Sequence, residues 1–498
     1  MAERLNGMYA FAIWDSRTEK LVMIRDRMGI KPFYYYPTAD GVLFGSEPKA
    51  ILAKRVVDAD GLREVLSLFK TPGQVVWAGM HEVMPGTVLT FDRNGRRTHR
   101  YWQLETREHL DDQQATIGRV RELLDDTVAR QLVADVPRCI LLSGGLDSSV
   151  LTGLAARQLR EQGEELRTFS VDFVGHEANF HADELHATPD GPYIRDMADH
   201  VGSRHATILL DNATLSDQDI RRRVITARDV PAGIGETDIS LYLLFKAIRE
   251  HSTVALSGES ADEIFGGYLW FHHPEVQKAD TFPWIAWIVS LLATLPGPPP
   301  EPTDNVELRS ALDIDGYIKD RYADAVAEVT PLPDESEHER RMRVICYLHL
   351  TRFLPMLLDR KDRLSMAVGL EVRVPFCDHR LIEYVYNTPW SLKTYDGREK
   401  SLLRGAAGDV LPKSVAERVK SPYPSPQSSQ YVTTLQEQAR ELVADRDHPL
   451  FTLTNWDTLA KVVKRDPADI DGGGQFILER NLDLAAWLDI CRPELRVS

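Results

Sequence analysis

The residue types best suited to phosphate chemistry gather directly after a strand-like apolar run at 139–142. This segment contains small, hydroxyl and acidic residues, namely Ser143, Gly144, Gly145, Asp147 and Ser148. We expect the strand to end in a glycine turn and Asp147 to cap a following helix. Unpaired N–H groups and the positive dipole end of a helix attract anions, and glycine lets the backbone approach them closely. The segment therefore predicts a cradle for phosphate.

The kind of phosphate chemistry follows from the motif at 143–148. The G-x-x-x-x-G-K-[ST] loop, whose lysine reaches the terminal phosphates of a nucleotide, occurs nowhere in the chain. S-G-G-x-D-S instead resembles the pyrophosphate loop of the ATP pyrophosphatase superfamily. That resemblance implies ATP, cleaved between its α and β phosphates, and a carboxylate or carbonyl oxygen that is adenylated. A turn that merely joins a strand to a helix is the simpler interpretation of a lone Gly-Gly pair, but the flanking strand, acid and serines disfavour it.

A second segment repeats this arrangement. The apolar run at 254–256 is followed by Ser257, Gly258, Glu259 and Asp262. Because ligands of an open parallel sheet bind beyond the carboxyl ends of its strands, we expect Glu259 and Asp262 to face the same crevice as Asp147. Acids beside a triphosphate indicate Mg²⁺, which prefers hard oxygen ligands and bridges phosphates. Simple capping of the next helix is the alternative, and the presence of the first segment favours the metal.

The elements that must position these segments predict an α/β fold. Residues 115 to about 270 alternate helical patterns with strands near 139–142, 167–173, 206–210 and 253–256. That alternation predicts a parallel sheet with helices on both faces, as in the ATP pyrophosphatases. From about 305 onward the pattern is mostly helical. We therefore predict one synthetase-type domain at 115–498, with the Pro-rich tract 296–303 as a linker or insertion.

The first part of the chain, 1–102, has a different pattern. Apolar alternation at 8–14 and 21–25 flanks a polar turn, which predicts a hairpin. Further short strands are expected at 33–36, 42–44 and 87–91. These elements predict a partial antiparallel α+β domain that precedes the parallel sheet.

Composition excludes several other classes of protein. A formal net charge of −16 without a basic tail or stripe argues against a nucleic-acid partner. The four cysteines are scattered without a C-x-x-C pair, which is typical of free thiols in a reducing cytoplasm and argues against a zinc site or disulfides. The longest apolar run, 282–295, is too short to span a bilayer and predicts a packed or lid helix. With no secretory signal at the start, we expect a cytoplasmic protein without a membrane partner.

Both segments, their order and their spacing resemble the glutamine-hydrolysing asparagine synthetase family. The motifs at 361–376, 397–400 and 418–422 resemble it as well, so the likeness extends over essentially the whole chain. The resemblance implies that Leu141, Val171, Ser257 and Gly258 line an adenosine pocket, mostly through their backbone. The family has Gly-Phe or Gly-Leu where this chain has Asp172-Phe173, so the adenine-side contact departs from the pattern.

The same resemblance implies the catalytic groups. Asp147 and Asp262 would hold magnesium on the pyrophosphate, and Lys420 would contact the phosphates, with Lys400 in a similar position. Glu259 would take the proton released when ammonia attacks a β-aspartyl-AMP intermediate, because the tetrahedral adduct must lose a proton to a nearby base. For a lysine outside such a motif, an exposed solvated side chain is the simpler interpretation. We expect Arg363, Glu371 and Arg373 to form a structural ion-pair network around the site.

Residues 1–102 resemble the second half of the family's class II glutamine amidotransferase domain. In that domain the nucleophile is an N-terminal cysteine, whereas position 2 here is Ala2 and the earliest cysteine is Cys139. Two explanations stay open, a start placed at an internal methionine or an ammonia-dependent enzyme. We favour the first, because the retained hairpins would otherwise have unpaired edges and a bare face.

The sequence therefore predicts a carbon–nitrogen ligase that uses aspartate, ATP and either ammonia or glutamine, with a homodimer left open. A β-lactam synthetase or a natural-product amide-forming ligase that acts on another carboxylate is the nearest alternative, because the motifs do not identify the acid. A non-catalytic binding protein is disfavoured because Asp147, Glu259, Asp262 and Lys420 are all present. A serine hydrolase is excluded because the chain has no G-x-S-x-G motif.

Overall fold

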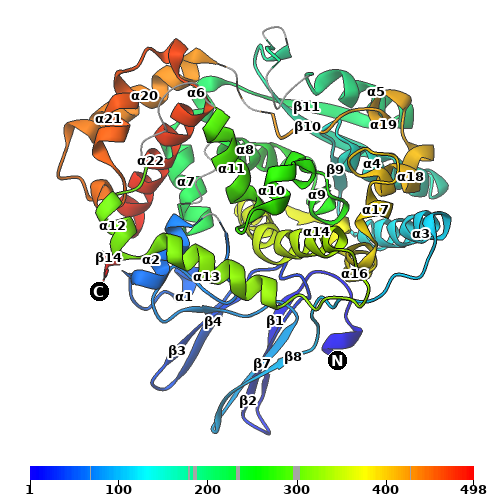
Figure 1. Ribbon diagram of the computed structural model, residues 1–498, viewed down its shortest axis with the longest axis horizontal. Coiled ribbons are helices and arrows are strands. Elements are labelled where there is room, and N and C mark those ends of the chain that lie inside the picture. Colours follow the sequence, from blue (N-terminus) through cyan, green and yellow to red (C-terminus); the bar gives the residue numbers. More distant parts are fainter. Residues whose placement is uncertain are drawn as a thin grey trace.

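A five-stranded parallel sheet forms the centre of the protein (Figure 1). The computed structural model describes residues 1–67, 69–177, 180–182, 188–231, 236–294, 303–424, 426 and 428–497. The strands of the sheet are β9 (Arg138–Leu141), β10 (Arg167–Phe173), β11 (Arg204–Leu210), β12 (Val254–Leu256) and β13 (Glu371–Arg373). The first four are the strands that the sequence predicts, and β13 is an addition from the region where helices prevail.

Both faces of this sheet are buried. Ile140 and Leu256 pack into one core with residues of α3 (Gln113–Gln131), α4 (Leu146–Glu161) and α5 (Gly191–Val201). Their neighbours Cys139 and Ala255 pack into another core with α7 (Gln218–Arg228), α8 (Glu236–Arg249) and α22 (Gly472–Cys491). Successive strand residues point to opposite faces, which explains why the last three residues of β9 and all of β12 are apolar, whereas β10 alternates polar residues with Phe169, Val171 and Phe173.

The order of the strands, β11-β10-β9-β12-β13, brings the two predicted phosphate segments together. The chain runs outward from β9 to β10 and β11, then returns to the other side of β9 with β12 and β13. β9 and β12 are therefore neighbours, and Ile140 lies opposite Leu256. Their carboxyl ends meet at the switch point of the sheet, where open α/β sheets bind ligands.

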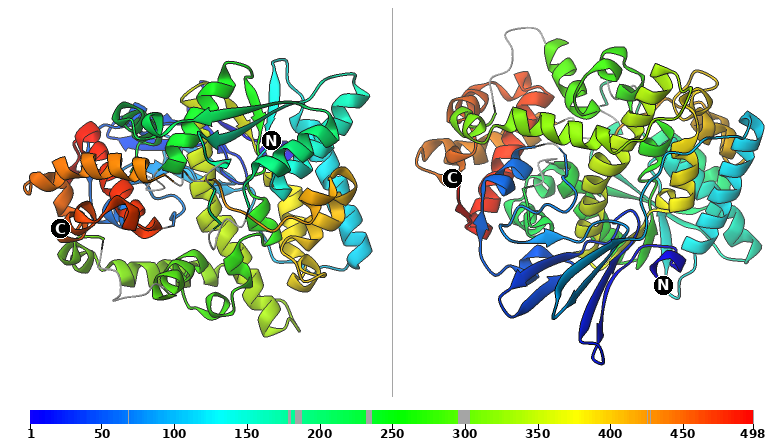
Figure 2. Two further views of the ribbon diagram at one scale, coloured as in Figure 1. Left: turned by 90° about the horizontal axis from the view of Figure 1, so that it is seen from above. Right: turned by 60° about the horizontal axis from the view of Figure 1, so that its bottom comes forward.

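Two antiparallel sheets are built from the first hundred residues. One has the order β1-β2-β7-β8 and the other β4-β3-β6. Their strands are β1 (Ala10–Asp15), β2 (Lys20–Arg25), β3 (Tyr34–Thr38), β4 (Gly41–Gly45), β6 (His81–Glu82), β7 (Thr87–Asp92) and β8 (Gly95–Arg100). The predicted hairpin is confirmed by the antiparallel pairing of β1 with β2. In the right view of Figure 2 these strands, in blue, extend below the helical body.

The remainder of the chain is mostly helical. Its longer helices are α11 (Pro283–Thr294), α13 (Ile314–Ala327), α14 (Glu337–Leu348), α15 (Leu354–Met366), α16 (His379–Asn387), α18 (Ser401–Ala407), α20 (Ser429–Ala444) and α21 (Trp456–Lys464). α11 occupies most of the apolar run 282–295, whereas Leu295 and residues 296–302 of the predicted linker lie outside the described residues. No helix in the described part of the chain is long and apolar enough to cross a membrane. All four cysteines are free, and Cys491 is only half-buried.

Candidate active site

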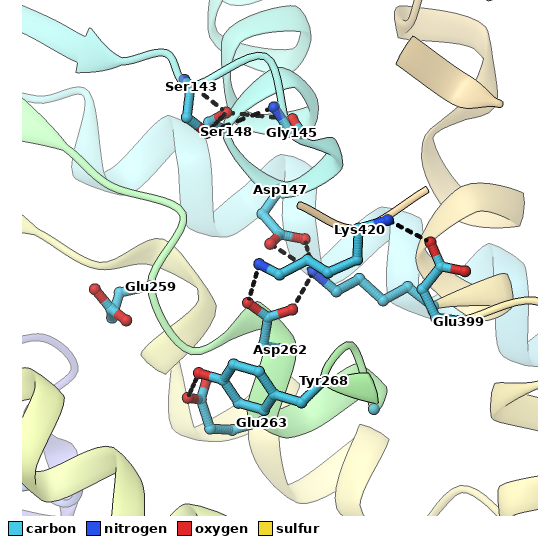
Figure 3. A network of polar contacts seen from close by, with 12 residues as sticks. Ser143, Gly145, Asp147, Ser148, Glu259, Asp262, Glu263, Tyr268, Glu399 and Lys420 are labelled. Carbon is cyan, nitrogen blue, oxygen red and sulfur yellow. Dashed lines mark hydrogen bonds and ion pairs between the residues drawn. The ribbon is translucent and has the colours of Figure 1, made fainter. Parts of the chain in front are cut away.

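The loop between β9 and α4 is organised by its own serines. The Ser143 backbone N–H donates to Ser148 Oγ at 3.1 Å, and Ser148 Oγ donates to the Gly145 carbonyl at 3.2 Å (Figure 3). Gly144 has a φ of 70°, and a Cβ at this position would lie 3.0 Å from the Ile194 backbone nitrogen. Both the left-handed backbone and the close packing therefore require glycine here. The result is the tight turn that the sequence predicts.

The expectation that Asp147 caps α4 is wrong. The helix starts at Leu146, its N-cap is Gly145, and Asp147 lies in the first turn. The Asp147 carboxylate instead accepts two hydrogen bonds from Lys400 Nζ, at 2.7 and 2.6 Å. The side chain cannot cap its own helix because it is held by a lysine from a distant part of the chain.

Two carboxylates and two lysines form a compact cluster beyond β9 and β12 (Figure 3). Lys400 Nζ lies between the acids, 2.6 Å from Asp147 Oδ2 and 2.5 Å from Asp262 Oδ1. Lys420 Nζ lies 2.7 Å from Asp262 Oδ2. Only 2% of the Lys400 side chain is exposed, so this ammonium is a fixed part of the site. The cluster is formally neutral by itself.

Burial raises the pKa values of Asp147 and Asp262, and the neighbouring lysines lower them. Burial favours the neutral form of Asp262, but Lys400 and Lys420 outweigh it and lower the pKa of Asp262 to about 2. Burial raises the pKa of Asp147, and Lys400 opposes that change only in part. Asp262 and Asp147 in turn overcome the burial of Lys420 and raise the pKa of its ammonium. The acid that contacts both lysines is therefore the more firmly ionised one.

The donor set fits a magnesium ion only together with phosphate oxygens. Within the described residues, no group of three or more His, Cys, Asp or Glu side chains is arranged to hold a metal. Asp147 and Asp262 offer hard carboxylate oxygens, each of which is at present held by a lysine. Magnesium is commonly bound by one or two carboxylates plus substrate phosphates, so these two acids suit it when a nucleotide supplies the remaining oxygens.

Glu259 lies apart from this cluster, and in Figure 3 no dashed line joins it to the other residues drawn. Its carboxylate pairs with Lys361 Nζ from α15. The same ammonium donates to Ser257 Oγ at 2.7 Å. The sequence motif contains Lys361, but its spacing gives no sign that this lysine meets Glu259, 102 residues earlier.

A cavity of about 200 Å³ extends from the carboxylate–lysine cluster to the pair of Glu259 and Lys361. Its walls include four residues predicted for adenosine (Leu141, Val171, Ser257, Gly258), five predicted for phosphate, metal or catalysis (Ser143, Gly145, Asp147, Ser148, Asp262), and also Glu259 and Lys420. Lys400 lines an adjoining cavity of about 50 Å³. Gly144 borders neither cavity and packs against Tyr193 and Ile194. The structure thus brings together all the predicted residues except Gly144, which shapes the turn.

Arg404 forms an arginine clamp on the loop that leads to Lys420, and the sequence motifs do not predict it. Arg404 Nη2 donates to Glu399 Oε1 at 2.5 Å and to the Arg418 carbonyl at 2.8 Å, and Arg404 also contacts the Ala416 carbonyl. Glu399 Oε1 accepts the backbone N–H of Lys420 at 3.2 Å (Figure 3). The clamp fixes the loop that presents Lys420. Only the position of Arg404, four residues after Lys400, could have indicated it.

The expected network of Arg363, Glu371 and Arg373 is two separate arrangements. Arg363 pairs with Asp229 and donates to the Ala227 carbonyl. Arg373 pairs with Glu371 at 2.7 Å and donates to the carbonyl of Gln131, the last residue of α3. The groups are separated because Arg363 belongs to α15, whereas Glu371 and Arg373 belong to the edge strand β13.

Both parts of the chain are similar to known protein families. The family described as Asparagine synthase matches residues 119–489, and the Glutamine amidotransferase domain matches residues 1–102. The chain is 38% identical over 471 residues to glutamine-hydrolyzing asparagine synthetase 3 of Bacillus subtilis, which covers 93% of this chain and 74% of that protein. Asparagine synthetase 1 of the same organism is 27% identical, over 85% of this chain and 68% of that protein. An amidase, chyE, of Penicillium rubens is 24% identical, over 97% of this chain and 79% of that protein.

Proposed function

Since the chain belongs to the asparagine synthetase family of carbon–nitrogen ligases, we propose that it converts aspartate to asparagine with ATP, through a β-aspartyl-AMP intermediate. The observation that carries the proposal is the convergence of the Ser143–Ser148 turn with Asp147, Asp262, Lys400 and Lys420 at the switch point of the parallel sheet. This arrangement suits an ATP whose pyrophosphate must depart.

In the first step a carboxylate oxygen of aspartate attacks the α-phosphorus of ATP, and the bond to the β-phosphate oxygen breaks. The leaving pyrophosphate gains negative charge, which the ammonium groups of the buried Lys400 and the half-buried Lys420 would neutralise without reorganisation. Asp147 and Asp262 would hold a magnesium ion, which supplies further charge neutralisation when bound. The Ser143–Ser148 turn would donate N–H and O–H groups to phosphate oxygens.

In the second step ammonia adds to the activated carbonyl carbon. The tetrahedral adduct carries a positive nitrogen that must lose a proton before AMP departs. Glu259 borders the cavity, away from the lysine cluster, and would accept that proton. The two halves of the reaction are thus assigned to two ends of one cavity.

We further propose that the polypeptide of 498 residues uses ammonia as its nitrogen source. The earliest cysteine in it, Cys139, lies in β9, where burial raises the pKa of its thiol to about 12. A buried thiol of this kind is inert as a nucleophile. We expect asparagine from ammonium but not from glutamine, in a preparation free of glutaminase; equal rates with both would contradict this proposal.

The proposed reaction is tested by incubating the protein with ATP, magnesium, ammonium and a panel of carboxylic acids, and by measuring pyrophosphate and the amide product. We expect aspartate to give asparagine, AMP and pyrophosphate in equal amounts. Turnover with another acid but not with aspartate would instead favour a β-lactam synthetase-like or natural-product ligase. The similarity to the Penicillium amidase, which extends over 97% of this chain, is the reason to include such acids. Scattering measurements on the same sample would test whether the protein forms a homodimer.

A further inference from the structure

Lys361 is a cavity residue with no role in the steps described so far. Its ammonium pairs with Glu259 and donates to Ser257 Oγ at 2.7 Å. Only 12% of the Lys361 side chain is exposed, and it borders the cavity. Most lysines extend into solvent, so an ammonium held in a cavity wall by two partners is a specific arrangement.

The backbone on both sides of Lys361 is fixed by other ion pairs. Arg360 pairs with Asp238 of α8, and Lys31 Nζ donates to Asp362 Oδ1 at 2.6 Å. α15 therefore cannot rotate or slide without breaking largely buried ion pairs on its other faces. Lys361 is the residue of this charged stretch that borders the cavity. The ion pairs of its two neighbours therefore fix the position from which Lys361 contacts Glu259.

The charges around Glu259 explain why it needs such a partner. Glu259, Asp262 and Glu263 lie within five residues of one another in the chain. Asp262 is balanced by Lys400 and Lys420, and Glu263 Oε1 accepts a hydrogen bond from the Tyr268 hydroxyl at 2.6 Å. Glu259 is left with Lys361 as its ion-pair partner among the described residues. Without this ammonium, no ion pair among the described residues would hold the Glu259 carboxylate in its present direction.

Phosphate binding is a less suitable role for Lys361. The predicted phosphate end of the cavity already holds two ammonium groups on Asp147 and Asp262, and Glu259 lies apart from that end in Figure 3. The contacts with Glu259 and Ser257 use two of the three N–H groups of the Lys361 ammonium. The contacts of Lys361 with Glu259 and Ser257 therefore favour a role in positioning the Glu259 base.

We propose that Lys361 is the positioning residue of the amidation step, which holds the Glu259 carboxylate in the orientation that receives the proton. The inference rests on the proposed function, in which Glu259 is the base. Lys361 acts through Glu259, so its loss should impair amidation and leave adenylation nearly intact. A general base that is displaced by about 1 Å forfeits about 10²-fold in rate.

The test compares two half-reactions in Lys361→Met, Glu259→Gln and the double variant. ATP–pyrophosphate exchange in the presence of aspartate reports adenylation, and asparagine formation from ammonium reports the whole reaction. We expect Lys361→Met to retain exchange within about threefold and to lose about 10²-fold in asparagine formation. Lys361→Arg, which keeps a cation, should recover most of that loss. Because both groups act as a unit, the double variant should be no slower than Glu259→Gln.

Lys413→Met is the matched control, because Lys413 is exposed on α19 (Lys413–Ala416) and lies outside both cavities. It should leave both assays unchanged. Equal losses in exchange and synthesis for a folded Lys361→Met, or a double variant slower than Glu259→Gln by the full Lys361→Met factor, would overturn the inference. If Glu259→Gln alone retains asparagine formation, or the unaltered enzyme makes none, the proposed function fails first and the inference falls with it.

Discussion

Replacing Gly267 by alanine tests the carboxylate–lysine cluster without changing any charge. Gly267 follows α9 (Ala261–Phe265), and its backbone N–H donates to the Asp262 carbonyl at 2.9 Å. A Cβ built on Gly267 would overlap Lys400 Cε and Asp262 Oδ1 and lie 2.8 Å from Lys400 Nζ. The added methyl would therefore enter the contact between the lysine and the acid.

The size of the effect follows from these distances. Carbon and nitrogen atoms in ordinary contact lie about 3.5 Å or more apart, so Lys400 must move by an amount on the order of 1 Å. Lys400 is almost fully buried, and Gly267 is tied to Asp262, so the displacement must pass into the cluster. We expect overpacking to cost about 1–3 kcal/mol of stability. A misplacement of about 1 Å in a catalytic group corresponds to about 10²-fold in rate.

ATP–pyrophosphate exchange with aspartate and magnesium measures the catalytic effect, and urea unfolding measures stability. Gly118→Ala provides the control, since this exposed glycine of α3 has nothing within 4 Å of an added Cβ. It should stabilise the protein by about 0.4–1 kcal/mol and leave exchange unchanged. If folded Gly267→Ala exchanges pyrophosphate within about threefold of the unaltered enzyme, adenylation does not need the cluster in this geometry.

Three other predictions address separate parts of the structure. Asp147→Asn keeps the size of the side chain but removes the charge that would face magnesium, so pyrophosphate release should fall by about 10² or more; near-normal release from a folded variant would refute the metal assignment. Arg404→Lys opens the clamp on the Lys420 loop, and the KM for ATP should rise about tenfold, while an unchanged KM would make the clamp irrelevant to binding. Burial lowers the pKa of His349 from 6.5 to about 3, so this group stabilises the fold above pH 6.5 and its contribution is lost as the pH falls toward 3. Between pH 6.5 and 5 the free energy of unfolding should drop by about 2 kcal/mol from this source. His349→Gln should flatten that slope in urea titrations, and an identical slope would show that other groups cause it.

The two loops of the site could be predicted because their chemistry is local. Ser143 to Ser148 and Ser257 to Asp262 each follow an apolar strand, and small residues mark the turn whatever the rest of the chain does. That these loops meet also follows from a general property of parallel sheets. The hairpin of β1 and β2 could be predicted for the same reason, since alternation of apolar and polar residues around a polar turn is a short-range signal.

The partners of the loop residues could not be predicted, because they come from distant segments. Lys400 lies 253 residues after Asp147, and it also diverts that acid from the helix cap that local rules favour. Lys361 meets Glu259 only because α15 packs beside β13. β13 itself has three residues, Glu-Val-Arg, which is too short for a period of two to be visible.

The charged stretch of α15 also determines how this protein could be recombined with others. Asp359 accepts from the Tyr34 hydroxyl at 3.2 Å, Asp362 from Lys31 at 2.6 Å, and Arg363 donates to the Ser46 carbonyl at 3.0 Å. A chimera that joins residues 103–498 to a foreign N-terminal part would remove these three contacts and leave Asp362 without its lysine, and breaking a buried ion pair costs about 3–5 kcal/mol. A functional chimera must therefore retain Lys31, Tyr34 and the backbone turn at Ser46. All three lie more than 300 residues before the helix that they contact.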